Sequence, residues 1–193
     1  MTTNDTSQPL HFVAVDPSLT STGFAVFDAD GKLIKCGSVK TVAKDDLDFR
    51  HKIIMQVFMG LFYEYPNCVL LIEAQFIQSW GGFSSNGVLK VTEVVGLIEG
   101  IYYAHCFANQ FSFRRKSILP RLINKLIGLK TTLKRKELKE YTRQRIDYLY
   151  PKAKIPNQDA YDAIAIGIGG MMLWKRDRLL EKVKKVDKVE KVC

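Results

Sequence analysis

The amino-acid sequence predicts one α/β domain in which a mixed five-stranded sheet is flanked by helices. Two short apolar runs, 11–16 (HFVAVD) and 68–73 (CVLLIE), each end in an acid, as buried strands with functional carboxyl ends do. The turn sequence DADG at 28–31 separates two further strand-like runs and predicts a hairpin. Helical patterns alternate with the later strands, which is typical of a sheet covered by helices.

The order of elements follows from apolar periodicity and from residues that start or stop helices. Pro66 and Pro151 end two helical patterns. Thr131 or Thr132 is expected to cap the penultimate helix, and Asn157 the last one. The remaining predicted strands are at 24–27, 33–38 and 111–115, with a turn at 20–23 and a glycine- and serine-rich loop at 79–87. Helices are predicted at 45–65, 88–106, about 132–149 and from about 158. The stretch 116–132 is ambiguous and contains a helix-like piece and a loop around Gly128.

Length and composition fit one compact, positively charged domain. The chain has 193 residues, 47% of them hydrophobic, which excludes a disordered chain, and no run is long and apolar enough to span a bilayer. Its net charge of +9 favours a polyanionic partner, although a lysine-rich solvated surface gives the same count. We expect a loose tail at 1–10, a folded domain at 11–175 and a basic extension at 176–193 that is a frayed helix or a loose tail.

The cysteines and histidines point to no metal or redox motif. The four cysteines lie far apart in the sequence, and no pair has the spacing of a zinc site or a redox-active pair. Cys68 opens an apolar run and is expected in the core. This pattern fits a reducing cytoplasm.

Four acids form the candidate site. Asp16 and Glu73 each close an apolar strand, and Asp159 and Asp162 share a face at the start of the last helix. Strand ends in an open α/β sheet meet at one edge, where ligands bind. A cluster of four carboxylates is unfavourable without cations, and divalent cations with oxygen ligands relieve that repulsion. Two such ions about 4 Å apart can promote phosphodiester hydrolysis.

Each acid also has a structural interpretation that is the more common one for a single residue. Asp16 could cap a turn, and Glu73 could form a salt bridge. Asp159 and Asp162 could interact favourably with the helix dipole. The four acids together, in this order and on these elements, favour the metal site.

Three short motifs resemble those of the RuvC family of Holliday junction resolvases. They are 15–23 (VDPSLTSTG), 72–76 (IEAQF) and 158–165 (QDAYDAIA), and the resemblance covers about 11–170. Ser18 stands where the family has a glycine. The resemblance implies an RNase H-like fold and a homodimer that nicks four-way DNA junctions with Mg²⁺ or Mn²⁺, two ions at each site, with Asp16, Glu73, Asp159 and Asp162 as catalytic and metal-binding residues.

The resemblance also implies DNA contacts. An aromatic residue at the position of Phe76 stacks on bases at the junction, although composition alone favours a core phenylalanine; Trp80 is a second candidate with less support. Lys136 matches one functional lysine of the family, and the other falls near Arg121 or Lys125. The short chain is similar to phage and bacterial resolvases, which implies the cytoplasm of a bacterium or a phage-infected host. The apolar stripe Val91, Val95, Ile98 and Tyr102 is the predicted dimer interface.

Other functions fit parts of the same pattern. A broader endonuclease that cuts forks and flaps would use the same acids, since the acids do not encode junction preference. A noncatalytic nucleic-acid-binding module on the same fold would not need all four of them. A sugar-kinase or actin-like ATPase also begins with an Asp-Gly turn, but it needs two such domains, and 193 residues are too few.

Overall fold

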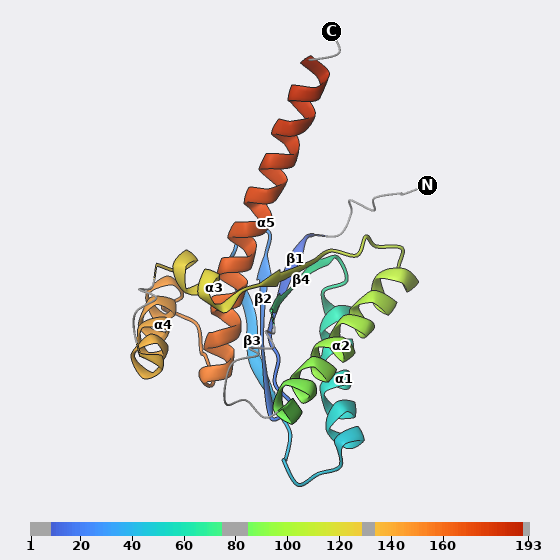
Figure 1. The fold of residues 1–193 in the computed structure, drawn as a ribbon, viewed down its shortest axis with the longest axis vertical. Helices are drawn as coiled ribbons and strands as arrows, with labels where there is room; N and C mark the ends of the chain where they lie inside the picture. Colours follow the sequence, from blue (N-terminus) through green and yellow to red (C-terminus); the bar gives the residue numbers. More distant parts are fainter. Residues whose placement is uncertain (1–8, 75–84, 129–133, 191–193) are drawn as a thin grey trace.

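The computed structural model describes residues 9–74, 85–128 and 134–190. These residues form a sheet covered on both faces by helices (Figure 1). Four residues discussed above, Phe76, Trp80, Thr131 and Thr132, lie outside the described residues. The strands of the described residues are β1 (His11–Asp16), β2 (Ser21–Asp28), β3 (Leu33–Lys40), β4 (Cys68–Glu73) and β5 (Arg115–Ile118).

The sheet is mixed and five-stranded, in the order β3-β2-β1-β4-β5, which confirms the predicted fold class. β1, β2 and β3 are antiparallel neighbours, whereas β4 runs parallel to β1 and β5 parallel to β4. The central strands β1 and β4 are buried on both faces, which explains why their sequences are continuously apolar rather than alternating. Because they are parallel, their acidic ends Asp16 and Glu73 lie at the same edge.

Two strand predictions are wrong in their bounds. The turn predicted at 20–23 is shorter, because β2 begins at Ser21 and Gly23 already pairs with Asp16. The last strand is 115–118, not 111–115. Phe113 fits a strand pattern by composition, but its ring packs against Tyr102, with 5.2 Å between ring centroids, in the connection that follows α2 (Ser85–Ala108).

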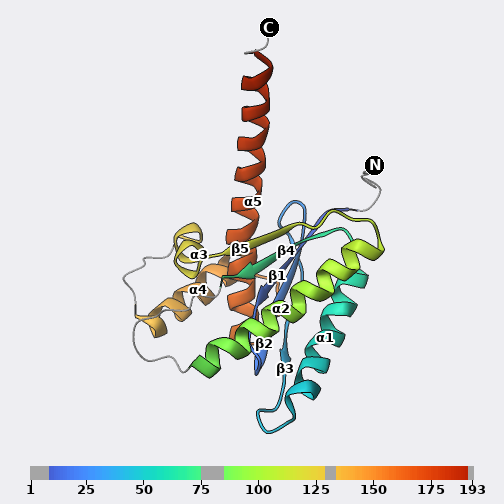
Figure 2. The ribbon, with the colours of Figure 1, turned by 45° about the vertical axis from the view of Figure 1, so that its right-hand side comes forward.

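Helices cover the two faces in two groups (Figure 2). The core on one face is shared with α1 and α2, and the core on the other face with α3, α4 and α5. Among the described residues, no helix is long and apolar enough to cross a membrane. The helices are α1 (Leu47–Glu64), α2, α3 (Pro120–Leu126), α4 (Arg135–Leu149) and α5 (Gln158–Glu190).

Of the two predicted N-caps, the structure confirms that of α5 and contradicts that of α4. Asn157 does cap α5, because its side-chain oxygen accepts a hydrogen bond of 3.1 Å from the Ala160 backbone N–H. The cap predicted at Thr131 or Thr132 is wrong: α4 begins at Arg135, and Lys134 is its N-cap. There the Glu137 carboxylate accepts the Lys134 backbone N–H at 3.0 Å, which satisfies one of the free amides of the first turn. The helix-like piece expected in 116–132 is α3, and Gly128 after it has a positive φ of 81°.

The last helix is longer than expected. It runs without a break to Glu190 and extends well beyond the sheet (Figure 1). An ion pair between Lys116 on β5 and Asp177 attaches it to the sheet near residue 177. Of the two alternatives for the basic extension, a helix or a loose tail, the helix holds as far as Glu190. The proposed division after residue 175 falls inside this helix and stays a prediction.

Candidate active site

The four predicted acids lie at one edge of the sheet. Asp16 ends β1 and Glu73 ends β4, one residue beyond the paired residues Val15 and Ile72. Asp159 and Asp162 lie in the first turns of α5, which crosses β1 and β2. All four side chains are partly buried. Asp16 and Glu73 therefore lie at the same edge of the sheet, as strand ends in an open α/β sheet predict.

A close approach of α5 to the sheet brings its acids to this edge. Gly23, the residue that pairs with Asp16, lies directly beneath the start of α5. A Cβ at Gly23 would stand 2.0 Å from the Asp159 carbonyl oxygen, a distance that no side chain can occupy. The Thr-Gly of the first motif is thus explained by packing, because only glycine lets the helix backbone come this near.

The four carboxylates interact electrostatically. Burial, and then the charges of Glu73, Asp162 and Asp159, raise the pKa of Asp16 to about 8. Burial, and then Asp162, raise the pKa of Glu73 to about 7. The pKa of Asp162 is also raised, mainly by burial. Protons or cations must therefore balance this cluster near neutral pH.

Nearby side chains already hold two of the acids. The Ser21 hydroxyl donates a 2.5 Å hydrogen bond to Asp159. The Gln158 amide donates to Asp162 at 2.8 Å. Lys139 on α4 lies 3.6 Å from the other Asp162 oxygen, and its charge opposes the rise in the pKa of both Asp16 and Asp162. The sequence motifs do not single out Lys139, which lies one helical turn after the predicted Lys136 on α4.

The chemistry of this donor set fits a hard divalent cation. All four groups supply carboxylate oxygens, the ligands that Mg²⁺ and Mn²⁺ prefer. Among the described residues, no three acid, histidine or cysteine side chains converge closely enough to hold an ion as they stand. Asp159 accepts the hydrogen bond of Ser21, and Asp162 accepts that of Gln158 and lies near Lys139, so each of these two acids keeps one oxygen in contact with the protein.

The turn between Asp16 and Ser21 is tightly bonded. The Ser18 hydroxyl accepts the Thr20 and Ser21 backbone N–H groups at 3.4 Å. The buried Thr22 hydroxyl donates to the Ser18 carbonyl and accepts the Ser18 N–H. Ser18, the departure from the family motif, thus supplies turn hydrogen bonds that a glycine could not.

In the described part of the chain, none of the predicted DNA-binding cations forms a hydrogen bond or ion pair with the four acids. Arg121 and Lys125 are exposed on α3, and Lys136 is exposed near the start of α4. Phe76 lies outside the described residues. Each assignment stays a prediction, and among the described lysines it is Lys139 that contacts one of the four acids.

The prediction that the apolar stripe of α2 forms a dimer interface is wrong. Ile98 and Tyr102 are fully buried in the core shared with α1. The Tyr102 hydroxyl also donates to the Cys68 carbonyl at 2.6 Å, which ties α2 to β4. A different face of α2 is exposed, with Leu89, Tyr103 and Phe107 on it.

Comparisons with known proteins agree on the fold. No family model and no curated protein matches the sequence. The structure of Thermus thermophilus RuvC in complex with Holliday junction substrate has a TM-score of 0.62 at 16% identity, over 82% of this chain and 91% of that one. The Fowlpox virus resolvase with Holliday junction DNA has a TM-score of 0.51 at 13% identity, over 85% and 98%.

A third solved structure, the yeast mitochondrial Holliday junction resolvase, has a TM-score of 0.50 at 16% identity, over 85% of this chain and 78% of that one. The fold of this protein is thus RNase H-like and similar in structure to resolvases of the RuvC type. At identities this low, the likeness shows the fold alone.

Proposed function

We propose that this protein is a metal-dependent endonuclease that nicks four-way DNA junctions by phosphodiester hydrolysis. The observation that carries the proposal is the convergence of four acids from three elements at one sheet edge, with the pKa of Asp16 raised to about 8 and that of Glu73 to about 7. A protein does not gather partly buried like charges for stability, and perturbed acids cluster at functional sites. Solved structures of similar fold are junction resolvases, two of them bound to Holliday junction DNA.

In this proposal Asp16, Glu73, Asp159 and Asp162 hold Mg²⁺, or Mn²⁺ in its place, with two ions at each site. When bound, such ions would make a water nucleophile available and would stabilise the leaving oxygen. The chain's own groups prepare the site. Ser21 orients Asp159, and Gln158 orients Asp162. Lys139 partly balances the negative charge before cations and the DNA phosphate arrive.

DNA binding would draw on the net charge of +9 and on exposed cations outside the acid cluster. Arg121, Lys125 and Lys136 are exposed and suited to phosphate contacts. Phe76, three residues after Glu73 in the sequence, is the proposed stacking residue. The nuclease domain would comprise 11–175, with the basic extension adding nonspecific affinity, in the cytoplasm of a bacterium or a phage-infected host.

A homodimer, with two active sites, would match the two-fold symmetry of a junction. The exposed face of α2 suits this role. Leu89 and Phe107 lie nine residues on either side of Ile98, and the exposed Gly96 and Gly100 lie two residues on either side. Two antiparallel copies would therefore pair the large residues and cross at the glycines. A charge at the edge of this face, Phe107→Glu, should turn a dimer into a monomer in sedimentation velocity; a monomeric wild-type chain would contradict the dimer.

Two alternatives remain as outcomes of the same test. A broader branched-DNA endonuclease would use the same acids on forks and flaps. A noncatalytic binding module would bind branched DNA without cutting it.

The test is a gel assay on a labelled four-way junction, a flap and a plain duplex. With Mg²⁺ we expect symmetric nicks in the junction, far slower cutting of the flap and duplex, and none in excess EDTA. Asp16→Asn, Glu73→Gln, Asp159→Asn and Asp162→Asn should each abolish nicking and leave junction binding intact. Wild-type cleavage in two or more of these variants would refute the assignment. Junction binding without nicking by the wild-type chain would favour the binding module.

A further inference from the structure

Arg50, near the start of α1, is a buried cation with neutral partners. Its side chain belongs to the buried set at 6% relative exposure. Among the described residues it forms no ion pair with a carboxylate, and the hydrogen bonds that it donates go to uncharged oxygens. Buried arginine is rare, and burying its charge costs free energy unless the charge is paired and hydrogen-bonded. Core stability alone is a poor explanation for it.

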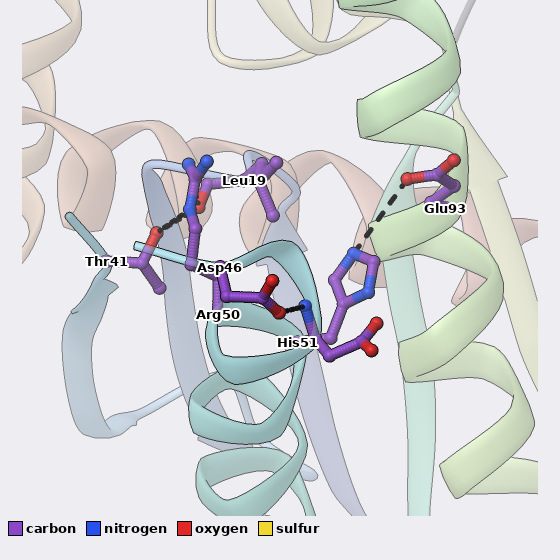
Figure 3. Close-up of polar contacts among 7 residues, drawn as sticks. Leu19, Thr41, Asp46, Arg50, His51 and Glu93 are labelled. Atoms are coloured by element: carbon purple, nitrogen blue, oxygen red, sulfur yellow. Dashed lines mark hydrogen bonds and ion pairs between the residues drawn. The ribbon is translucent and has the colours of Figure 1, made fainter. Parts of the chain in front are cut away.

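The oxygens that Arg50 binds belong to Leu19, between β1 and β2, and to Thr41, between β3 and α1 (Figure 3). Its Nη2 donates to the Leu19 carbonyl at 3.2 Å, and its Nε donates to the Thr41 hydroxyl at 3.0 Å. The Thr41 hydroxyl in turn donates to the same Leu19 carbonyl at 2.5 Å, and the Thr41 N–H donates to the Thr20 carbonyl at 3.0 Å. One planar guanidinium therefore fixes two chain segments at once.

The clamped segment lies between one acid, Asp16, and Ser21, the serine that donates to another acid. Residues 17–20 begin directly after Asp16 and end directly before Ser21. Ser21 donates to Asp159, so a shift of this turn moves the end of β1 and the hydrogen-bond donor of an α5 acid together. The Ser18 and Thr22 hydroxyls bond the turn within itself, while Arg50 and Thr41 bond it from outside.

We propose that Arg50 is a positioning residue: through the Leu19 carbonyl it sets the turn 17–20, and thereby holds Asp16 and the Ser21–Asp159 pair in the geometry that the reaction needs. This inference rests on the proposed function. It assigns Arg50 no contact with DNA or with the reacting atoms. Its charge is retained because a guanidinium fork reaches two acceptors that no neutral side chain of this length could join.

The test compares Arg50→Met with wild type and with the control His51→Gln. Methionine keeps the length and apolar stem of arginine and removes the donors. His51 is the next residue of α1, but it lies 4.0 Å from Glu93 on α2 and does not contact the turn (Figure 3). Hydrogen exchange is followed in metal-free protein, together with the melting temperature, nicking of the four-way junction and junction affinity.

We expect Arg50→Met to keep its melting temperature within a few degrees and to bind the junction as wild type does. Amide exchange in residues 17–22 should rise at least tenfold, and nicking should fall by about 100-fold, the cost of misplacing catalytic groups by about an ångström. His51→Gln should change neither. Arg50→Lys, which reaches one acceptor at a time, should recover part of the nicking.

The outcomes separate this inference from the function itself. Unchanged exchange in 17–22 would overturn the positioning role, whatever the activity. Faster exchange with full nicking would also overturn it, because the turn would then be irrelevant to the site. If wild type itself fails to nick, the proposed function fails; the Arg50 inference then rests on exchange and on Mn²⁺ affinity, which Arg50→Met must lower at least fivefold for it to stand.

Discussion

The two helical layers that cover the sheet are packed in opposite ways. On the α1 and α2 face, large rings fill the space: Phe62 lies 6.2 Å from Phe58 and 5.1 Å from Tyr102 between ring centroids. On the α5 face, glycines let the helix lie almost on the strands. A Cβ at Gly167 would stand 2.2 Å from the Phe27 ring, and one at Gly23 would stand 2.0 Å from the Asp159 carbonyl.

This difference separates stability from function. The ring-filled layer buries large apolar side chains and supplies much of the stabilising burial. The glycine-lined layer has less side-chain volume, so α5 packs closer to the strands. This close packing brings the acids of α5 to the ends of β1 and β4. We therefore expect changes in the glycine-lined layer to affect activity first, and changes in the ring-filled layer to affect stability first.

The largest effect is expected at Gly23. Gly23→Ala adds a methyl group where the Asp159 backbone already lies, so α5 must shift by about an ångström, and nicking should fall by about 100-fold or more. The matched control is Gly60→Ala on α1, where a Cβ meets nothing within 4 Å. It should stabilise the protein by up to about 1 kcal/mol and leave nicking unchanged. Single-turnover nicking rates and urea melts distinguish the two, and normal nicking by Gly23→Ala would break the comparison.

At Phe58 we expect the opposite result, a large loss of stability with little loss of nicking. This side chain is fully buried between Phe24 and Phe62. Phe58→Ala should lower the free energy of unfolding by about 3–5 kcal/mol, because it removes buried area and leaves a cavity. Its nicking rate per folded molecule at low temperature should stay within a few-fold of wild type. A loss as large as that of Gly23→Ala would mean that the two layers are not separable.

A smaller effect concerns pH. The pKa of Asp16 is about 8 in the folded protein against 3.8 as its ordinary value, so the folded state holds its proton more tightly. The metal-free protein must then lose stability as pH rises from about 4 to about 8. Asp16→Asn removes that loss, so its melting temperature should match wild type near pH 4 and exceed it by at least about 3 °C at pH 8.5. Equal melting curves at pH 8.5 would contradict the raised pKa.

Much of this site could be predicted from the sequence because its main features are local. A continuous apolar run that ends in an acid is enough to identify a buried strand with an acidic end. β1 and β4 match their predicted bounds. Two parallel strands place such acids at one edge without further information. Asn157 caps α5 as the sequence predicts, so the helix start that carries Asp159 and, one turn later, Asp162 is also predictable.

The remainder depends on contacts between distant segments. The contact of Lys139 with Asp162, and the hydrogen bond between Ser21 and Asp159 at a sequence separation of 138, leave no local pattern. The role of α2 was misread because apolar residues occur on more than one of its faces. Periodicity alone did not reveal that Ile98 and Tyr102 face the core while Leu89 and Phe107 face outward.

Titration calorimetry of metal-free protein with Mn²⁺ at pH 7 tests the central claim most directly: that the four acids form one divalent-cation site. Asp16 and Glu73, with pKa values of about 8 and about 7, still hold protons at this pH. Binding must displace them, so the heat should vary between buffers of different ionisation enthalpy and report release of roughly one proton or more. Asp16→Asn should bind at least tenfold more weakly and release fewer protons. Equal Mn²⁺ affinity in wild type and Asp16→Asn, or no binding by either, would contradict the claim.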